Sequence, residues 1–243
     1  MAGPLEQFKI KPLIELPSIG GIDISYTNSA LWMTIAVVVV MLFLMLGTRQ
    51  RALVPGRWQS MAEMTYEFVN NMLTDQAGSG GKPFFPFVFT LFMFILAGNL
   101  LGMVPYSFTF TSHIIVTFGL AFVVFIGVTI IGFIRHGAHF LSFFVPKGVP
   151  AVMLILLVPI EILSYLIRPV SLSIRLFANM MAGHTMLKVF AGFVVGLGVL
   201  GGWAPLALNV VLTGFEILVA LLQTYVFAVL TCIYLNDALH MEH

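Results

Sequence analysis

The most constraining feature of this sequence is an apolar run that is too long for one upright membrane helix. The run extends from Ala151 to about Val195, which as helix measures roughly 68 Å against a hydrocarbon core of roughly 30 Å. A second long run, Leu206 to Leu235, measures about 45 Å as helix. We therefore expect both segments to tilt steeply, kink or divide, with their turn over 196–205. The candidate kink sites are Pro159, Pro169 and Gly183.

The N-terminal half contains three apolar runs of ordinary spanning length and one amphipathic segment. Ala30 to Gly47 predicts the first membrane helix, and 84–134 predicts a helical hairpin formed by Phe84 to Val104 and Ile114 to Ile134. Over 58–74 the apolar residues follow a helical period, which predicts an amphipathic helix on the membrane surface. Ser60 with Glu63 three residues later predicts a capping box at its start.

These segments predict an all-α polytopic membrane protein with about five membrane helices and one amphipathic surface helix. The last two helices, over 151–236, form a long, steeply tilted hairpin in this interpretation. The chain is 60% hydrophobic and 9% charged, whereas soluble domains carry roughly 25% charged residues. We find no internal repeat and expect a single membrane domain over 1–243, in which 1–29 is an N-terminal segment without the apolar core of a signal peptide.

The basic residues near span ends predict the orientation. The loops 105–113 and 196–205 carry no Lys or Arg. The opposite side, which we therefore expect to be cytoplasmic, carries Arg49, Arg51, Arg57, Lys82, Arg135 and Lys147. With five spans the N-terminus then faces outward and the C-terminus inward. A bacterial plasma membrane and, as the alternative, a mitochondrial inner membrane both meet these demands.

Composition and motifs argue against several functions. The net charge is +1 and the basic residues are scattered, which argues against nucleic-acid binding. Cys232 is the single cysteine, so neither a disulfide nor a thiolate metal cluster is expected. His184 is the one histidine at membrane depth, which leaves a haem without a second axial histidine. Hydrolase motifs such as HExxH and GxSxG are missing from the sequence, and we expect no cofactor and no metal.

Five charged residues lie inside the two long runs, namely Glu161, Arg168, Arg175, Lys188 and Glu216. A charge at the bilayer centre costs about 2.5 to 3.5 kcal/mol on insertion scales, so each needs a reason. Lys188 lies close to an end and can extend to the interface, and Arg168 has a structural or a functional role. Arg175 has no acid three or four residues away, so its counter-charge must come from elsewhere.

Angular positions place the polar residues of the long runs on stripes. Glu161, Arg168 and Arg175 fall within about 40° of one another at 100° per residue. Ser171 and Asn179 lie one turn on either side of Arg175, and the last run has Asn209, Glu216 and Gln223 seven residues apart. His184 lies nine residues after Arg175, on the opposite side of the helix. It is placed to pair with Glu216 as a proton relay.

The segment Ser171 to His184, SLSIRLFANMMAGH, resembles the signature of subunit a of the F-type ATP synthases. The resemblance extends to Glu161, Glu216, Gln223, the NLLGMVP segment at 99–105 and the order of spans. Many bacterial members are expected to have the acid and the histidine exchanged between positions 184 and 216. The arrangement here is similar to mitochondrial and alphaproteobacterial members. Gly102 stands where some bacterial members carry an aspartate.

The resemblance implies a stator beside a rotating c-ring whose small subunits each carry one buried carboxylate. It implies further partners in the peripheral stalk b subunits and the rest of the complex, with protons as the transported ion and ATP chemistry in other subunits. Arg175 would face the ring beside Asn179 and Gln223 and prevent a short circuit between two half-channels. The outer one would be lined by Glu216, His184, Asn99 and His113, and the inner one by Glu161, Ser171 and Ser173. Asn209 belongs to the polar stripe of Glu216.

Physical reasoning supports a fixed arginine in this place, because a cation lowers the pKa of a passing carboxylate and releases its proton. Arginine keeps its own proton and holds a carboxylate with a planar fork. The main alternative from the residues alone is a stand-alone secondary ion transporter, which also uses intramembrane charges and kinked helices. A purely structural role would leave Arg175, Glu216 and Gln223 as contacts between helices.

Overall fold

The computed structural model describes residues 6–15, 25–49, 52–104, 107–137, 139–140, 145 and 150–240. Within them, five helices are long and apolar enough to cross a membrane, and this confirms the predicted all-α polytopic class. The α-helices are α1 (Asn28–Thr48), α2 (Arg57–Ala77), α3 (Phe85–Gly102), α4 (Ile114–His136), α5 (Ala151–Gly201) and α6 (Trp203–Leu239). The shorter elements are η1 (Glu6–Phe8), η2 (Ser79–Phe84), η3 (Phe110–Ser112) and the antiparallel strands β1 (Pro12–Ile14) and β2 (Tyr26–Thr27).

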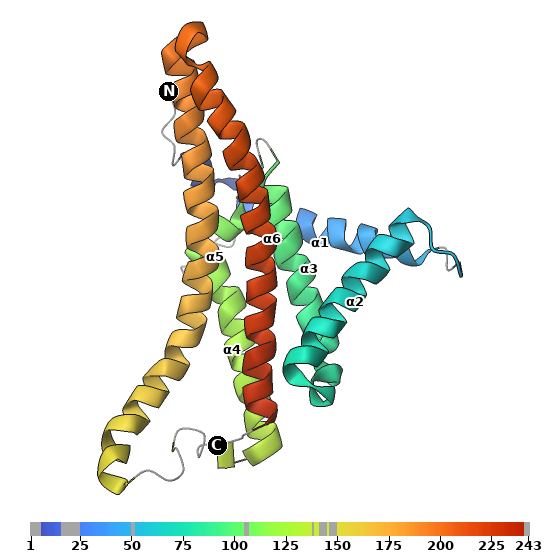
Figure 1. Cartoon of the computed structure of the whole chain (residues 1–243), viewed down its shortest axis with the longest axis vertical. Helices are drawn as coiled ribbons and strands as arrows, with labels where there is room; N and C mark the ends of the chain where they lie inside the picture. The colour runs from blue at the N-terminus through green and yellow to red at the C-terminus, as the bar shows by residue number, and fades with distance from the viewer. Residues whose placement is uncertain are drawn as a thin grey trace.

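The two longest helices form the hairpin that the sequence predicts (Figure 1). The chain reverses at Gly198, whose φ of 61° and ψ of −162° are conformations that glycine adopts without strain. The Gly202 amide then donates to the Gly198 carbonyl over 2.8 Å. The reversal falls inside the predicted turn over 196–205.

The prediction that the long segments divide or kink at Pro159, Pro169 or Gly183 is only partly right. Both prolines lie inside α5, and Gly198 is its one residue with non-helical backbone angles. The first part of α5 bends away from α6 (Figure 1), as expected for a helix in which a proline removes a backbone hydrogen bond. Pro169 itself is buried beside Tyr234 of α6, so the two helices run together at that residue. Gly183 leaves the helix unbroken, and its missing side chain makes room for a residue of α6 instead.

Helix α2 matches the predicted amphipathic segment but starts earlier. Its buried residues, Ala62, Val69, Met72, Leu73 and Ala77, lie on one side. The predicted capping box at Ser60 is wrong, because the helix begins at Arg57 after an extended Gly56. The Ser60 amide therefore already donates to the Gly56 carbonyl, over 2.8 Å, and a residue inside the first turn cannot act as the cap.

Helix α6 lies at the centre of the fold, whereas α5 lies at its edge (Figure 1). Buried residues of α6 pack with those of α2, α3, α4 and α5 in two hydrophobic clusters. In the most apolar 18-residue stretch of α5, only 6% of the residues are buried. Helix α6 therefore packs against all of these helices, whereas α5 has an outer face that no described residue covers.

The connection between α3 and α4 folds back into the protein. Phe110 of η3 is 1% exposed, and its ring lies against Gly98 of α3 and packs 5.4 Å from the Phe94 ring. This buried, chargeless segment agrees with the predicted hairpin over 84–134. Pro105 and Tyr106 lie outside the described residues.

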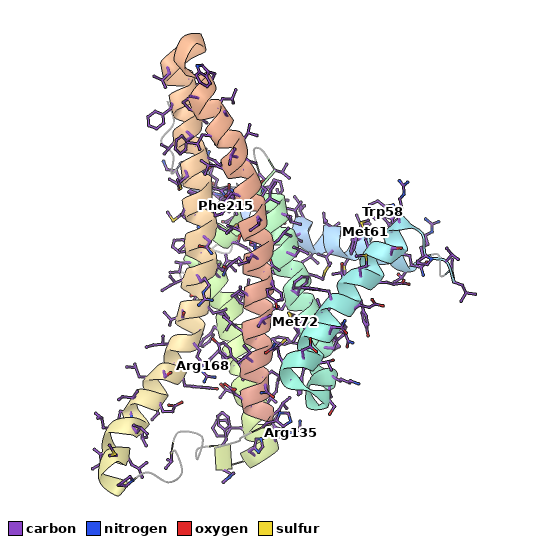
Figure 2. The ribbon with its side chains drawn as sticks, in the orientation of Figure 1. Trp58, Met61, Met72, Arg135, Arg168 and Phe215 are labelled. Carbon is purple, nitrogen blue, oxygen red and sulfur yellow. The ribbon has the colours of Figure 1, made fainter. Side chains whose placement is uncertain are left out.

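One end of the molecule collects several of the predicted cytoplasmic positions. Gly80 of η2 lies next to His240, just beyond the end of α6, and Arg135 at the end of α4 lies near the same end (Figure 2). This grouping agrees with the predicted orientation of Lys82, Arg135 and the C-terminus. Arg51 and Lys147, which entered that prediction, lie outside the described residues, and sidedness stays a prediction.

We predict that Gly98→Ala destabilises the protein, because a Cβ at this position would overlap the buried Phe110 ring. Overpacking of this kind costs about 1–3 kcal/mol. A lower thermal denaturation temperature of the detergent-solubilised complex measures it. Gly127→Ala in α4 is the matched control, since no heavy atom lies within 4 Å of a Cβ there. Equal denaturation temperatures for both variants would contradict the prediction.

Candidate functional site

A buried acid and a histidine meet where α5 and α6 run side by side. Glu216 of α6 is 4% exposed, and its Oε1 forms an ion-pair contact with Nδ1 of His184 on α5. A Cβ on Gly183 would lie 2.6 Å from the same Oε1, so glycine is required for the carboxylate to fit. The predicted contact of His184 with Glu216 is confirmed, and its role as a proton relay stays a prediction.

The other nitrogen of the His184 ring contacts the loop that follows α3. Its Nε2 lies 2.8 Å from the Thr109 hydroxyl oxygen and 2.9 Å from the Gly102 carbonyl oxygen. The Thr109 hydroxyl also donates to this carbonyl, over 3.2 Å. The histidine is therefore held between α6 on one side and the α3–α4 loop on the other.

A second set of polar contacts continues along α6. The Asn179 amide of α5 donates to the Gln223 carbonyl oxygen over 2.9 Å. The Asn99 amide of α3, which is fully buried, donates to the Ala220 carbonyl over 3.2 Å and to the Thr224 hydroxyl over 3.1 Å. Gln223 of the predicted stripe thus faces a polar group of α5, and Asn99 of α3 binds the turn of α6 on either side of Gln223.

Arg175 lies outside this buried network. Its side chain is exposed, and it forms no ion pair or hydrogen bond with the described residues. Ser171, Ala178 and Ala182 are exposed on the same helical face, while Leu176 is fully buried on the other. The prediction that His184 and Arg175 line different environments is confirmed.

The remaining predicted site residues are dispersed. Ser173 is buried and donates to the Val170 carbonyl of its own helix over 3.0 Å. Glu161 is half-buried in the first part of α5, and Asn209 is half-buried near the start of α6. His113 precedes α4, with its ring stacked 5.1 Å from that of Phe108, and burial lowers its pKa. No hydrogen bond among the described residues joins these four to the His184–Glu216 pair.

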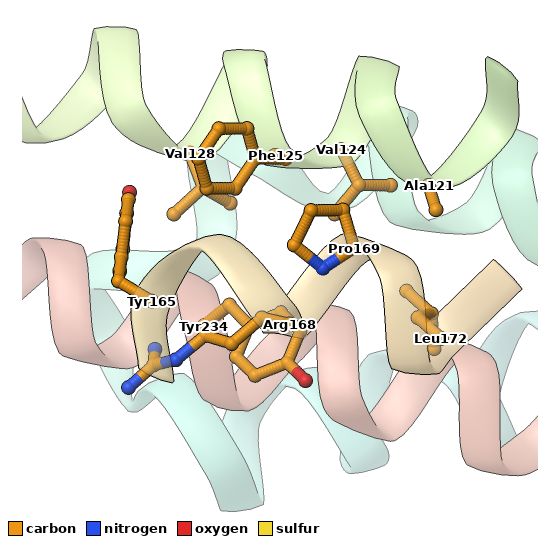
Figure 3. Close-up of a pocket in the computed structure, with 9 residues that line it drawn as sticks. All are labelled: Ala121, Val124, Phe125, Val128, Tyr165, Arg168, Pro169, Leu172 and Tyr234. Atoms are coloured by element: carbon orange, nitrogen blue, oxygen red, sulfur yellow. The ribbon is translucent and has the colours of Figure 1, made fainter. Parts of the chain in front are cut away.

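Arg168 is held by an ion pair that the sequence analysis missed. Its Nη1 lies 2.7 Å from Oδ2 of Asp237 on α6. The guanidinium carbon also lies 5.4 Å from the ring centre of Tyr165 and 5.0 Å from that of Tyr234 (Figure 3), within the range of cation–π attraction. Figure 2 shows Arg168 extending from α5 toward α6. Its structural role is therefore to join α5 to α6.

A signal for Asp237 was present in the sequence. The spacing of seven residues from Asn209 to Glu216 and Gln223 continues through Leu230 to Asp237, and the apolar Leu230 interrupts the stripe. Thr109 had no such signal, because its position depends on how an irregular loop folds back. The cavity beside Arg168 is about 10 Å³, which is at the lower limit for a single water and too small for a substrate.

The site is a set of polar side chains between helices. Among the described residues, no group of three or more His, Cys, Asp or Glu side chains could hold an ion. The polar groups instead form a line of proton donors and acceptors from the α3–α4 loop through His184 and Glu216. Fold and site together define a polytopic membrane protein with ionisable side chains buried between its long paired helices.

Comparison with known proteins places the chain within this class. The family model described as ATP synthase A chain matches residues 30–236, and the chain belongs to this family. Proteins named ATP synthase subunit a are similar over nearly their whole length. The one from Pelagibacter ubique is 58% identical over 240 residues, covering 99% of this chain and 98% of the relative. That from Mesorhizobium japonicum is 61% identical over 246 residues, covering 99% and 97%, and that from Rhodospirillum rubrum is 56% identical over 242 residues, covering all of both.

We predict that Arg168 and Asp237 are energetically coupled. Arg168→Gln and Asp237→Asn each remove one partner of the 2.7 Å contact, so the double variant should lose less stability than the sum of the single losses. Contacting charges of this kind couple by about 0.5–3 kcal/mol. A double-mutant cycle on thermal denaturation of the purified complex measures the coupling. Strictly additive losses would show that the ion pair does not hold the helices together.

Proposed function

We propose that this chain is the proton-translocating stator subunit of an ATP synthase membrane sector. The observation that carries the proposal is the separation of charges on one helix. Arg175 is exposed on the outer face of α5, while the His184 side chain is only 12% exposed and lies against Glu216 on the inner side. Membership of the ATP synthase A chain family supports this function over the stand-alone transporter.

The outer face of α5 suits a second chain that brings its own carboxylate. Arg175 lacks an acidic partner among the described residues, and an uncompensated charge at membrane depth is costly. The exposed Ser171, Ala178 and Ala182 around it are small, which lets another helix approach closely. A c-ring carboxylate arriving there would be held ionised by the guanidinium and would therefore release its proton.

The half-channels that we propose follow the buried polar groups. The outer one contains Glu216, His184 and Asn99, with His113 and Asn209 toward its entrance. The inner one is bordered by Glu161, Ser171 and Ser173, and Asn179 with Gln223 lies beside the arginine. A full crossing of one proton supplies about 2.3 kcal/mol per 100 mV. Arg175 prevents a direct path between the channels, so protons cross only when the ring turns.

We further propose that this chain is not itself an enzyme and that partner subunits carry out the ATP chemistry. Its 243 residues would form one membrane domain in the bacterial plasma membrane, with the mitochondrial inner membrane as the alternative. An apolar groove of about 620 Å³ between α2, α3 and α6, lined by Phe68, Phe92 and Leu222 among others, is a suitable surface for a membrane helix of a peripheral stalk b subunit.

We predict that Arg175→Ala abolishes ATP-driven proton pumping while the complex still assembles, because the exposed side chain makes no ion pair among the described residues. Pumping in inverted vesicles at matched complex levels should fall below roughly one tenth of the wild-type rate. The reason is that the variant lacks a charge that acts during proton transfer. Lys188→Gln, an exposed cation on the same helix, is the control and should pump normally. Normal pumping by Arg175→Ala would exclude the proposed mechanism.

We predict that cysteines on the Arg175 face of α5 cross-link to a c-ring subunit. In a Cys232→Ser background, Ala178→Cys and Ala182→Cys are exposed positions on this face. Leu172→Cys and Leu176→Cys are buried on the other side and serve as controls. Oxidation with a cysteine beside the ring carboxylate should give a product from the outward positions alone. The absence of any product at the outward positions would contradict the proposed partner.

A further inference from the structure

We propose that Thr109 and the Gly102 carbonyl fix the protonation pattern of the His184 ring, so that Nδ1 alone exchanges a proton with Glu216. Thr109 is thus a positioning residue for proton transfer. The inference rests on the proposed function, in which His184 and Glu216 carry protons. It goes beyond that function by assigning a role to a loop hydroxyl.

The contacts around Nε2 decide which nitrogen carries the permanent proton. A carbonyl oxygen can only accept, and the Gly102 oxygen lies 2.9 Å from Nε2. If Nε2 lacked a proton, two lone pairs would face each other at this distance. If Nε2 carries one, both the carbonyl and the Thr109 oxygen 2.8 Å away can accept it. The loop therefore favours the ring that is protonated on Nε2.

The end of α3 adds to this preference. Gly102 is the last residue of the helix, so its carbonyl has no amide partner within the helix. The C-terminal end of a helix carries partial negative charge, which favours a protonated imidazole beside it. The Ser107 hydroxyl donates to the same carbonyl over 2.9 Å and holds the loop in place. The carbonyl is thus oriented by the fold before any proton arrives.

The protonation pattern leaves one site for exchange. With Nε2 protonated, neutral His184 presents a lone pair on Nδ1 toward Oε1 of Glu216. A proton on the carboxyl group can pass to Nδ1, which gives an imidazolium and a carboxylate, and the reverse step restores both groups. The Nε2 proton stays in place throughout. Among the described residues Glu216 is the titratable group in contact with the ring, and Lys188, one turn further along α5, is exposed.

The Thr109 side chain both forms hydrogen bonds and fills space, and two substitutions can separate these roles. Thr109 is 4% exposed. A Cβ on Gly102 would lie 2.7 Å from its Cγ2 and 2.8 Å from its Oγ1, so both branches of the side chain fill space beside α3. Valine keeps that volume without the hydroxyl, and serine keeps the hydroxyl without the methyl group.

The test compares Thr109→Val with Thr109→Ser by ATP-driven proton pumping per assembled complex. Thr109→Val should pump roughly tenfold more slowly, as expected for the loss of a hydrogen bond to a charged ring. Thr109→Ser should stay within about twofold of the wild type. Thr231→Val is the matched control, because among the described residues this buried hydroxyl donates only to the Phe227 carbonyl of its own helix. The reverse order, slow serine and normal valine, would show a packing role and overturn the inference.

Glu216→Gln, measured in parallel, separates the inference from the proposed function. If Glu216→Gln is impaired and Thr109→Val is normal, the inference alone is overturned. If both pump normally, the proposed function fails as well. Solid-state ¹⁵N NMR of the reconstituted wild-type complex tests the protonation pattern directly, even if Thr109→Val does not assemble. The His184 signals, assigned by their loss in His184→Gln, should show a protonated Nε2, and a neutral ring protonated only on Nδ1 would overturn the inference.

Discussion

The rest of the structure depends on how ionisable and amide side chains are accommodated between apolar helices. Each costs free energy in the membrane unless a partner compensates it, and the partners come from other helices. Glu216 meets His184, Arg168 meets Asp237, and Asn179 meets Gln223. All three contacts join α5 to α6, so the pairing that lowers the cost of polar groups also holds the hairpin together. Arg175, exposed and without such a contact among the described residues, is the exception.

The long helix pair combines rigidity with an open outer face. Four helices support α6, and its buried polar groups are thereby held at defined positions. The buried residues of α5 lie on one side of the helix, and they are Tyr165, Pro169, Leu172, Ser173, Leu176 and Met180. A histidine and an arginine nine residues apart on α5 consequently have opposite surroundings, which sequence spacing alone already indicates.

Helical periodicity explains what could be predicted and what could not. The spans, the hairpin turn near Gly198 and the His184–Glu216 pair follow from apolar run lengths and from angles of about 100° per residue. The start of α2 was misplaced, because an extended glycine at position 56 left no side-chain signal. The contacts of Thr109 and of the Gly102 carbonyl with His184 could not be predicted. They join residues 75 and 82 positions apart, and the irregular loop after Gly102, which carries Thr109, has no period. Asp237 was missed because Leu230 interrupts the stripe.

The exposed face of α5 has a consequence for biogenesis. A helix with an arginine and small residues turned outward is poorly matched to lipid, since acyl chains offer the cation no counter-charge. The free subunit would therefore draw water or lipid headgroups toward the bilayer interior, where they would disturb the membrane. If a second chain covers this face, as proposed, its absence leaves the arginine without a counter-charge. We then expect the free subunit to be less stable in the membrane than the assembled one.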